Sequence, residues 1–187
     1  MINAQLKQKR AYAVNNFYTS LIFAKKHKIQ IMIETGKAAP DFNLFDTDKN
    51  KFTLSECKGK NVLLLFFPQA FTGVCTKELC AVRDDIARYN SVNAEVIGIS
   101  VDSVFTLKKF KEDQGYNFTL LSDFNKEVST TYGSLYIDWI LDMKGVSKRS
   151  AFVIDKEGIV RYAQVLESAG DLPDFAAINE VLDTLKG

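Results

Sequence analysis

The chain has 187 residues and a formal net charge of +1, from 24 Lys and Arg against 23 Asp and Glu. A chain of this length is expected to form one domain that buries about two-thirds of the surface exposed when it is unfolded. Its composition is that of an ordinary globular protein, and no apolar stretch approaches the ~20 residues of a membrane-spanning helix. We therefore expect no membrane partner.

Residues 1–31 differ in charge from the rest of the chain. They hold six basic groups and no Asp or Glu, which leaves 18 basic against 23 acidic groups in residues 32–187. A body with this charge is not suited to bind nucleic acid. Polar residues interrupt the apolar core that a secretory signal needs, and Lys outnumbers Arg, unlike in most transit peptides. We predict that residues 1–31 are an extension, disordered, weakly helical or preceding a functional start at Met32. The domain then spans residues 32–187 and is expected in the cytoplasm.

The first predicted elements of this domain are a β-hairpin and a buried strand. Residues 42–45 and 51–54 are two short apolar runs around a Thr-Asp-Lys-Asn turn, which favours a hairpin. Residues 62–67 are a continuous apolar run that is too short for a helix. Such a run is typical of a strand buried on both faces of a sheet.

A helix with a cysteine in its first turn is predicted to follow that strand. After a loop at residues 68–74, apolar side chains recur at helical spacing. They are Cys75, Leu79, Val82, Ile86 and Tyr89. The N–H groups of a helix's first turn have no partner within the helix, and the helix dipole places positive charge there. This position stabilises a thiolate, and the carboxyl end of a central strand is where α/β sheets usually bind ligands.

The later elements alternate between strands and helices. We predict a strand at residues 95–101, a helix capped by Asp102 or Ser103 and ended by Gly115, and a strand at residues 118–121. A short helix at residues 125–132, a hairpin of residues 151–154 and 159–165, and a closing helix from Pro173 follow. This order predicts an α/β fold with a central mixed sheet flanked by helices, compatible with a thioredoxin-like fold.

Several catalytic arrangements are excluded by the residues that the domain lacks. The single histidine, His27, lies in the extension, so the domain offers no imidazole for a Ser-His-Asp or Cys-His pair or for zinc. It contains neither a Cys-x-x-Cys pair nor a glycine-rich phosphate loop. We expect no metal and no cofactor. A reactive cysteine here must be activated by the helix terminus, by hydrogen bonds and by a guanidinium.

Pro68, Thr72 and Cys75 form the pattern Pro-x-x-x-Thr-x-x-Cys, which resembles the active-site motif of the peroxiredoxins. The resemblance extends over residues 32–187 and includes residues 37–42 and 96–103. Residues 71–75 with Glu78 are closest to the AhpE-like branch, whereas the spacing of Cys75 and Cys80 resembles the PrxQ (bacterioferritin comigratory protein) branch. The resemblance implies a thioredoxin-like fold and peroxide reduction through a sulfenic acid at Cys75. Without the motif, a buried thiol that acts as a small hydrophobic group would be the better interpretation.

The resemblance also implies roles for two charged residues. It places Arg149 against the thiolate, where its charge would favour ionisation and hold the peroxide oxygens. Taken alone, Arg149 would better be interpreted as a surface arginine beside Lys148. Glu78 could orient Arg149, or it could be a carboxylate near the positive end of the helix dipole.

The other two cysteines leave open how the sulfenic acid is resolved. Cys80 lies about 140° around the helix from Cys75, which predicts that it joins the polar side with Lys77 and Asp84. It could form a disulfide with Cys75 if the helix unwinds, because a disulfide tolerates about 7 Å between Cα atoms. Alternatively, Cys80 is uninvolved and an outside thiol recycles a one-cysteine enzyme. Cys57 matches no role in the family, and we expect it to be incidental.

The leading hypothesis is therefore a thiol-dependent peroxidase that uses thioredoxin, glutaredoxin or a small thiol as its reductant. A peroxide sensor or redox-regulated holdase, and a catalytically silent interaction domain, are the alternatives. Residues 135–143 carry more apolar side chains than a surface connection needs. In peroxiredoxins this region often contributes to a dimer contact, so we expect a homodimer.

Overall fold

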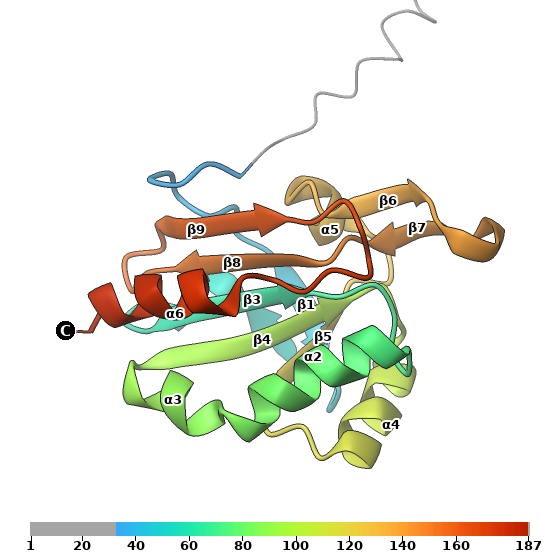
Figure 1. Cartoon of the computed structure of the whole chain (residues 1–187), viewed down its shortest axis with the longest axis horizontal. Helices are drawn as coiled ribbons and strands as arrows, with labels where there is room; N and C mark the ends of the chain where they lie inside the picture. Colours follow the sequence, from blue (N-terminus) through green and yellow to red (C-terminus); the bar gives the residue numbers. More distant parts are fainter. Residues whose placement is uncertain (1–32, 187) are drawn as a thin grey trace, which may run out of the picture. The chain divides into compact units, whose positions relative to one another are not determined.

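The computed structural model describes residues 33–186 (Figure 1). The predicted extension, residues 1–31, lies outside the described residues, so its boundary with the domain stays a prediction. None of the helices formed by residues 33–186 combines the length and apolar character needed to cross a membrane. All elements below belong to this one unit of the chain.

A seven-stranded mixed sheet forms the centre of the fold, with the strands in the order β2-β1-β5-β4-β3-β8-β9. Strands β3, β4 and β5 run parallel, and the neighbours on both sides are antiparallel to them. The bounds are β1 Asn43–Asp46, β2 Lys51–Thr53, β3 Asn61–Phe66, β4 Ala94–Ser100, β5 Thr119–Ser122, β8 Ser150–Ile154 and β9 Val160–Val165. The two predicted hairpins and the buried central strand are confirmed.

Strand β3 is buried on both faces because its side chains alternate between two hydrophobic cores. Leu63 and Leu65 point to a core that is covered by α2 Gly73–Asp84, α3 Ile86–Ser91, α4 Val104–Gln114 and α6 Phe175–Thr184. Val62, Leu64 and Phe66 point to the opposite core, which is closed by the short helices η1 Leu54–Cys57 and α5 Glu127–Thr131. The layers are visible in Figure 1, where β3 lies between β4 and β8.

The helix that begins before Cys75 does not continue unbroken to Tyr89. It ends at Asp84, and a second helix starts at Ile86 after Asp85 leaves helical geometry at φ −103°, ψ 17°. Two consecutive aspartates have low helix propensity, and a carboxylate at the start of α3 suits the positive end of its dipole. The apolar stripe still reaches across the break, because Val82 and Tyr89 pack in the same core.

Two predicted helix starts are now defined by their caps. Ser103, rather than Asp102, caps α4 by accepting the N–H of Thr106 at 3.2 Å. The closing helix begins at Phe175 and not at Pro173, with Asp174 accepting the N–H of Ala177 at 3.0 Å. A short polar side chain at each N-cap satisfies one of the free N–H groups of the first turn.

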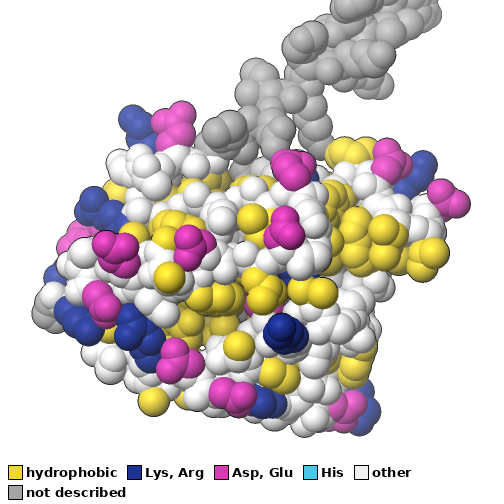
Figure 2. All heavy atoms as spheres, viewed as in Figure 1, with side chains coloured by type: hydrophobic (Ala, Val, Ile, Leu, Met, Phe, Trp, Pro, Cys, Tyr) yellow, Lys and Arg dark blue, Asp and Glu magenta, His cyan; other side chains and the backbone are white. Residues whose placement is uncertain are grey.

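The apolar segment at residues 135–143 belongs to a third hairpin, which the sequence pattern did not predict. Strands β6 Leu135–Asp138 and β7 Lys144–Ser147 pair antiparallel, with a single 3-10 turn, η2 Ile140–Asp142, between them. Leu141 and Asp142 adopt left-handed φ angles of 56° and 58°, which non-glycine residues rarely do. Ile137, Ile140 and Leu141 are 62%, 61% and 86% exposed. Figure 2 shows hydrophobic side chains gathered over this hairpin.

Candidate active site

Cys75 lies in the first turn of α2, beyond the carboxyl end of β3. Thr72 is the N-cap residue in an extended conformation, and its carbonyl oxygen accepts the N–H of Thr76 at 2.9 Å. The Cys75 side chain is buried. The sulfur therefore sits where the free N–H groups and the dipole of α2 favour negative charge.

Arg149 is brought to the sulfur from a distant part of the chain. It directly precedes β8, which pairs with β3, and its side chain is 1% exposed. Its Nη2 donates to Cys75 Sγ at 3.3 Å and to the Ala169 carbonyl oxygen at 2.9 Å. A buried guanidinium in contact with a thiol stabilises the thiolate. The interpretation of Arg149 as a surface residue is wrong.

Glu78 holds the other side of the same guanidinium. Its Oε2 forms an ion pair with Arg149 Nη1, and both side chains are buried. Burial raises the pKa of Glu78 to about 7, although the charge of Arg149 acts in the opposite direction. Glu78 Oε1 is buried and has no hydrogen-bond partner among the described residues. Cys75, Arg149 and Glu78 thus form one buried chain of contacts from the thiol to the carboxyl group.

Thr72 and Pro68 line the approach to Cys75. Pro68 is buried, and the half-buried Thr72 donates its hydroxyl proton to the Gln69 carbonyl oxygen at 2.9 Å. Both residues face an open cleft of about 470 Å³ that also reaches Cys75 and Arg149. The far wall of the cleft is apolar and aromatic, formed by Tyr136, Trp139 and Ile140 of the β6–β7 hairpin.

Two residues support the active-site loop in a way that the sequence did not predict. Asp102 Oδ2 accepts the N–H of Ala70 at 2.8 Å, which ties the loop to the end of β4. Phe71 adopts a left-handed φ of 63° and packs its ring on Phe110 of α4, with the centroids 4.8 Å apart. The loop between Pro68 and Cys75 is therefore fixed from two sides before α2 begins.

Comparison with known proteins assigns the family. The model of the AhpC/TSA family matches residues 35–163. Alkyl hydroperoxide reductase E of Mycobacterium tuberculosis is 38% identical over 157 residues, which are 82% of this chain and 99% of that protein. This chain is a peroxiredoxin of the AhpC/TSA family. Chloroplastic peroxiredoxin Q of rice, Oryza sativa subsp. japonica, is 39% identical over 130 residues. The match covers 70% of this chain and 58% of the rice protein.

Solved structures agree with this assignment. The crystal structure of peroxidoxin BcpB from M. tuberculosis is 33% identical, with a TM-score of 0.69 over 82% of this chain and 96% of that one. The reduced 2-Cys peroxiredoxin of Plasmodium vivax is 31% identical, with a TM-score of 0.70 over 80% of each chain. The predicted thioredoxin-like α/β fold is confirmed. The peroxiredoxin is a thiol-dependent peroxidase, with a peroxide as its substrate and a thiol as its reductant.

Cys80 of this peroxiredoxin is less exposed than its predicted place on the polar side of the helix implies. It is half-buried and packs against the core under α2, while Lys77 and Asp84 are exposed as predicted. Its thiol donates to Gln114 Oε1 at a sulfur–oxygen distance of 3.7 Å. The helical wheel was correct about its direction, but that side of α2 faces the end of α4 and not solvent.

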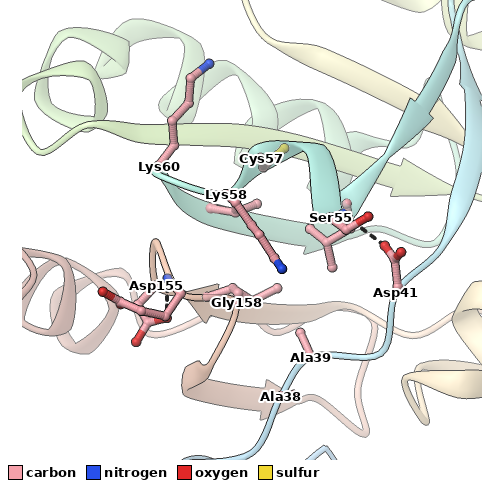
Figure 3. A pocket seen from close by; sticks show the side chains of 13 residues that line it. Ala38, Ala39, Asp41, Ser55, Cys57, Lys58, Lys60, Asp155 and Gly158 are labelled. Carbon is pink, nitrogen blue, oxygen red and sulfur yellow. Dashed lines mark hydrogen bonds between the residues drawn. The ribbon is translucent and has the colours of Figure 1, made fainter.

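Cys57 is separate from these residues. It is buried at the end of η1, on the opposite face of the sheet from Cys75. Figure 3 shows it beside a cavity of about 250 Å³ that also contacts Lys58, Asp41 and Asp155. Burial raises the pKa of Cys57 to about 11, so its thiol is protonated at neutral pH and is a poor nucleophile. Within residues 33–186, the side chains of His, Cys, Asp and Glu form no cluster able to hold a metal ion.

Proposed function

We propose that Cys75 is the nucleophile that reduces the peroxide. Its thiolate attacks the terminal peroxide oxygen, a sulfur–oxygen bond forms and the oxygen–oxygen bond breaks. The leaving oxygen takes a proton and departs as water or an alcohol, and Cys75 is left as a sulfenic acid. The contact between Arg149 Nη2 and Cys75 Sγ at 3.3 Å is the observation that supports this role most directly.

Arg149 acts in two steps of this reaction. It stabilises the thiolate, and its donors then face the negative charge that develops on the peroxide oxygens as the bond breaks. Glu78 orients the guanidinium by holding Nη1, which leaves Nη2 for the sulfur. Thr72 supplies a hydroxyl at the helix start, and a rotation of that hydroxyl away from Gln69 would let it donate to the bound peroxide.

Cys80 resolves the sulfenic acid in our proposal. Both cysteines lie within α2, and Cα atoms five residues apart in a helix are about 8–9 Å from each other. A disulfide needs them closer than about 7 Å, so the first turns of α2 unwind when it closes. A dithiol such as thioredoxin or glutaredoxin is suited to reduce this disulfide, whereas a small thiol would suffice for a one-cysteine enzyme.

The cleft suggests the kind of peroxide that it accepts. Its apolar wall of Tyr136, Trp139 and Ile140 offers contact area to an organic chain next to the polar end at Cys75. A relative of similar length is named an alkyl hydroperoxide reductase. We propose that the enzyme reduces organic hydroperoxides as well as hydrogen peroxide.

A homodimer is proposed to cover the exposed side chains of the β6–β7 hairpin. Ile137, Ile140 and Leu141 project from the hairpin that forms the far wall of the cleft, so a partner there would lie beside the active site.

We propose residues 32–187 as the functional unit and the cytoplasm as its location. A chain that starts at Met32 should retain turnover and thermal stability, and fractionation of cells should find the enzyme in the cytoplasm.

Turnover is tested by following peroxide consumption with thioredoxin, glutaredoxin or a small thiol as alternative reductants. Wild-type protein should consume many equivalents of peroxide, and Cys75→Ser should consume none while keeping its melting temperature. Consumption that stops after one equivalent with every reductant would favour a sensor and refute the proposed cycle. Unchanged turnover in Cys75→Ser would remove Cys75 from the reaction.

A further inference from the structure

Three parts of the active-site loop and α2 contact α4 and the residues that follow it. Phe71, before the helix, packs on Phe110. Cys80, in the middle of α2, donates to the Gln114 side chain. Near the end of α2, the Arg83 guanidinium donates to the Gln114 carbonyl oxygen. In Figure 1 the two helices lie on the same side of the sheet, and these contacts join them.

Gln114 is placed for this contact by the way α4 ends. It is the last residue of α4, and Gly115 follows it in a left-handed conformation at φ 64°, which glycine adopts without strain. The half-buried Gln114 side chain then reaches Cys80, while the Gln114 carbonyl group stays with Arg83. Both groups of one residue therefore contact α2, three residues apart along that helix.

Tyr116 lies on the same side of Cys80. Burial raises the pKa of Tyr116, and the nearby Cys80 raises it further. The Tyr116 hydroxyl is buried and has no hydrogen-bond partner in the described part of the chain. Cys80 is thus held in a defined position that points away from the thiolate site, since Cys75 contacts Arg149 on the other side of the helix.

The end of α2 is also held by the residues that follow α4. Besides the Arg83 contact, Asn117 Nδ2 donates to the Arg83 carbonyl oxygen at 3.2 Å. At the start of α2, Thr72 does not cap the first turn through its side chain. When α2 unwinds, the bond between Cys80 and Gln114 is the contact that must break, because Arg83 can stay in place.

We propose that Gln114 is a positioning residue that holds Cys80 on α4 in the reduced enzyme and thereby limits the rate at which Cys80 resolves the sulfenic acid. This inference rests on the proposed resolving role of Cys80. In the step concerned, the Cys75 sulfur–oxygen bond breaks and a bond between the two sulfurs forms. The oxygen leaves with the Cys80 proton and one further proton as water, so Cys80 is oxidised and the Cys75 sulfur is reduced.

The rate of this step decides the fate of the enzyme at high peroxide. A sulfenic acid that has not yet reacted with Cys80 can react with a second peroxide to give a sulfinic acid. Most thiol reductants cannot reduce a sulfinic acid back to the thiol. A residue that delays the release of Cys80 therefore makes the enzyme more sensitive to over-oxidation. Gln114 acts on this balance without contact to the peroxide or to Cys75.

The test measures resolution directly in the full-length enzyme. Reduced protein is mixed with peroxide, quenched with an alkylating agent at successive times, and weighed by mass spectrometry. Resolution is the phase whose rate does not depend on peroxide concentration, since it occurs within one chain. In Gln114→Ala this phase should be about two- to tenfold faster, the range expected for one lost hydrogen bond. The peroxide-dependent phase should be unchanged.

Two further variants distinguish loss of the contact between Gln114 and Cys80 from a general destabilisation of α4. Gln114→Glu keeps an acceptor in the same place, and a carboxylate accepts more strongly, so its resolution should be no faster than that of wild type. Asp113→Ala changes the neighbouring exposed residue, whose one ion pair among the described residues is with Lys109, and should leave both phases unchanged. Gln114→Ala should also accumulate less sulfinic acid at high peroxide.

The outcomes distinguish this inference from the function on which it rests. Wild-type protein that gains a stable oxygen and never forms the disulfide would refute the resolving role of Cys80 and the role of Gln114 with it. A wild-type disulfide that forms equally fast or faster than in Gln114→Ala would refute only the role of Gln114. Equal acceleration in Gln114→Glu or Asp113→Ala would show that general loosening of α4, and not the lost contact, is the cause.

Discussion

Removing the charge pair behind Cys75 should slow peroxide reduction strongly. Arg149 Nη2 lies 3.3 Å from Cys75 Sγ, and Arg149 and Glu78 are both buried. Two unit charges about 4 Å apart attract by about 4 kcal/mol at an effective dielectric constant of 20. The opposite charge of Glu78 offsets part of this attraction, so we expect a loss of about 2–4 kcal/mol, or about 30- to 1,000-fold in rate.

The variant that tests Arg149 must not leave the buried carboxylate of Glu78 without an opposite charge. Arg149→Met by itself would strand the Glu78 carboxylate and destabilise the fold. The double variant Arg149→Met with Glu78→Gln removes both charges and keeps the volume. Arg88→Met, which breaks a surface pair with Asp183, serves as the control for loss of an arginine elsewhere.

The assay follows the second-order reaction of reduced protein with peroxide over a range of pH. Alkylation of the Cys75 peptide by iodoacetamide, read by mass spectrometry, reports the reactivity of that thiol independently of peroxide. The double variant should react slowly with peroxide and with iodoacetamide, whereas Arg88→Met should match wild type. A double variant that folds and reacts within about threefold of wild type would contradict the role given to Arg149.

Three other outcomes are expected. One equivalent of peroxide should remove about two mass units from wild type by joining Cys75 to Cys80, while Cys80→Ser should keep one added oxygen; a link to Cys57 would move the resolving role there. The raised pKa of Glu78, about 7 in the fold against 4.5 in its ordinary state, means that the folded chain binds a proton which the unfolded chain releases. The free energy of unfolding should therefore fall through this group as pH rises from about 4.5 to about 7. The melting temperature of Glu78→Gln, although lowered overall because Arg149 loses its partner, should gain on that of wild type as pH rises over that range. A gain that is absent or reversed would contradict this titration. Light scattering should show a dimer at micromolar concentration that Leu141→Asp dissociates, and a wild-type monomer would refute the proposed contact.

The parts of the site that the sequence predicted are those encoded locally. The apolar run of β3 and the helical spacing after Cys75 are properties of neighbouring residues, and they were sufficient to place a cysteine at a helix start. The motif of Pro68, Thr72 and Cys75 then identified the family by resemblance. These residues lie together along the chain, and the cleft brings all three to one surface.

The contacts that the sequence alone did not predict come from residues far apart in the chain. Arg149 is 74 residues from Cys75, and β8 places it there by pairing with β3. Without the family resemblance, nothing in its neighbours separates it from a surface arginine. Asp102 likewise reaches Ala70 because the parallel strands β3 and β4 end side by side.

Cys80 and the β6–β7 hairpin show two other limits of sequence patterns. A helical wheel gives the direction of Cys80 but contains no information about which element packs on that side, so Gln114 and Tyr116 were missed. The hairpin turns at Leu141 and Asp142 with left-handed backbone angles. Leu141 is not among the residue types, Gly, Asn and Asp, from which such a turn is usually predicted.

The identity of the reacting sulfur is the central claim, and trapping the sulfenic acid tests it most directly. Cys80→Ser protein is treated with one equivalent of peroxide in the presence of dimedone, which forms a stable adduct with sulfenic acids. Peptide mapping should find the adduct on Cys75 in nearly every chain and none on Cys57. An adduct on Cys57, or peroxide consumed with Cys75 still a free thiol, would contradict the account.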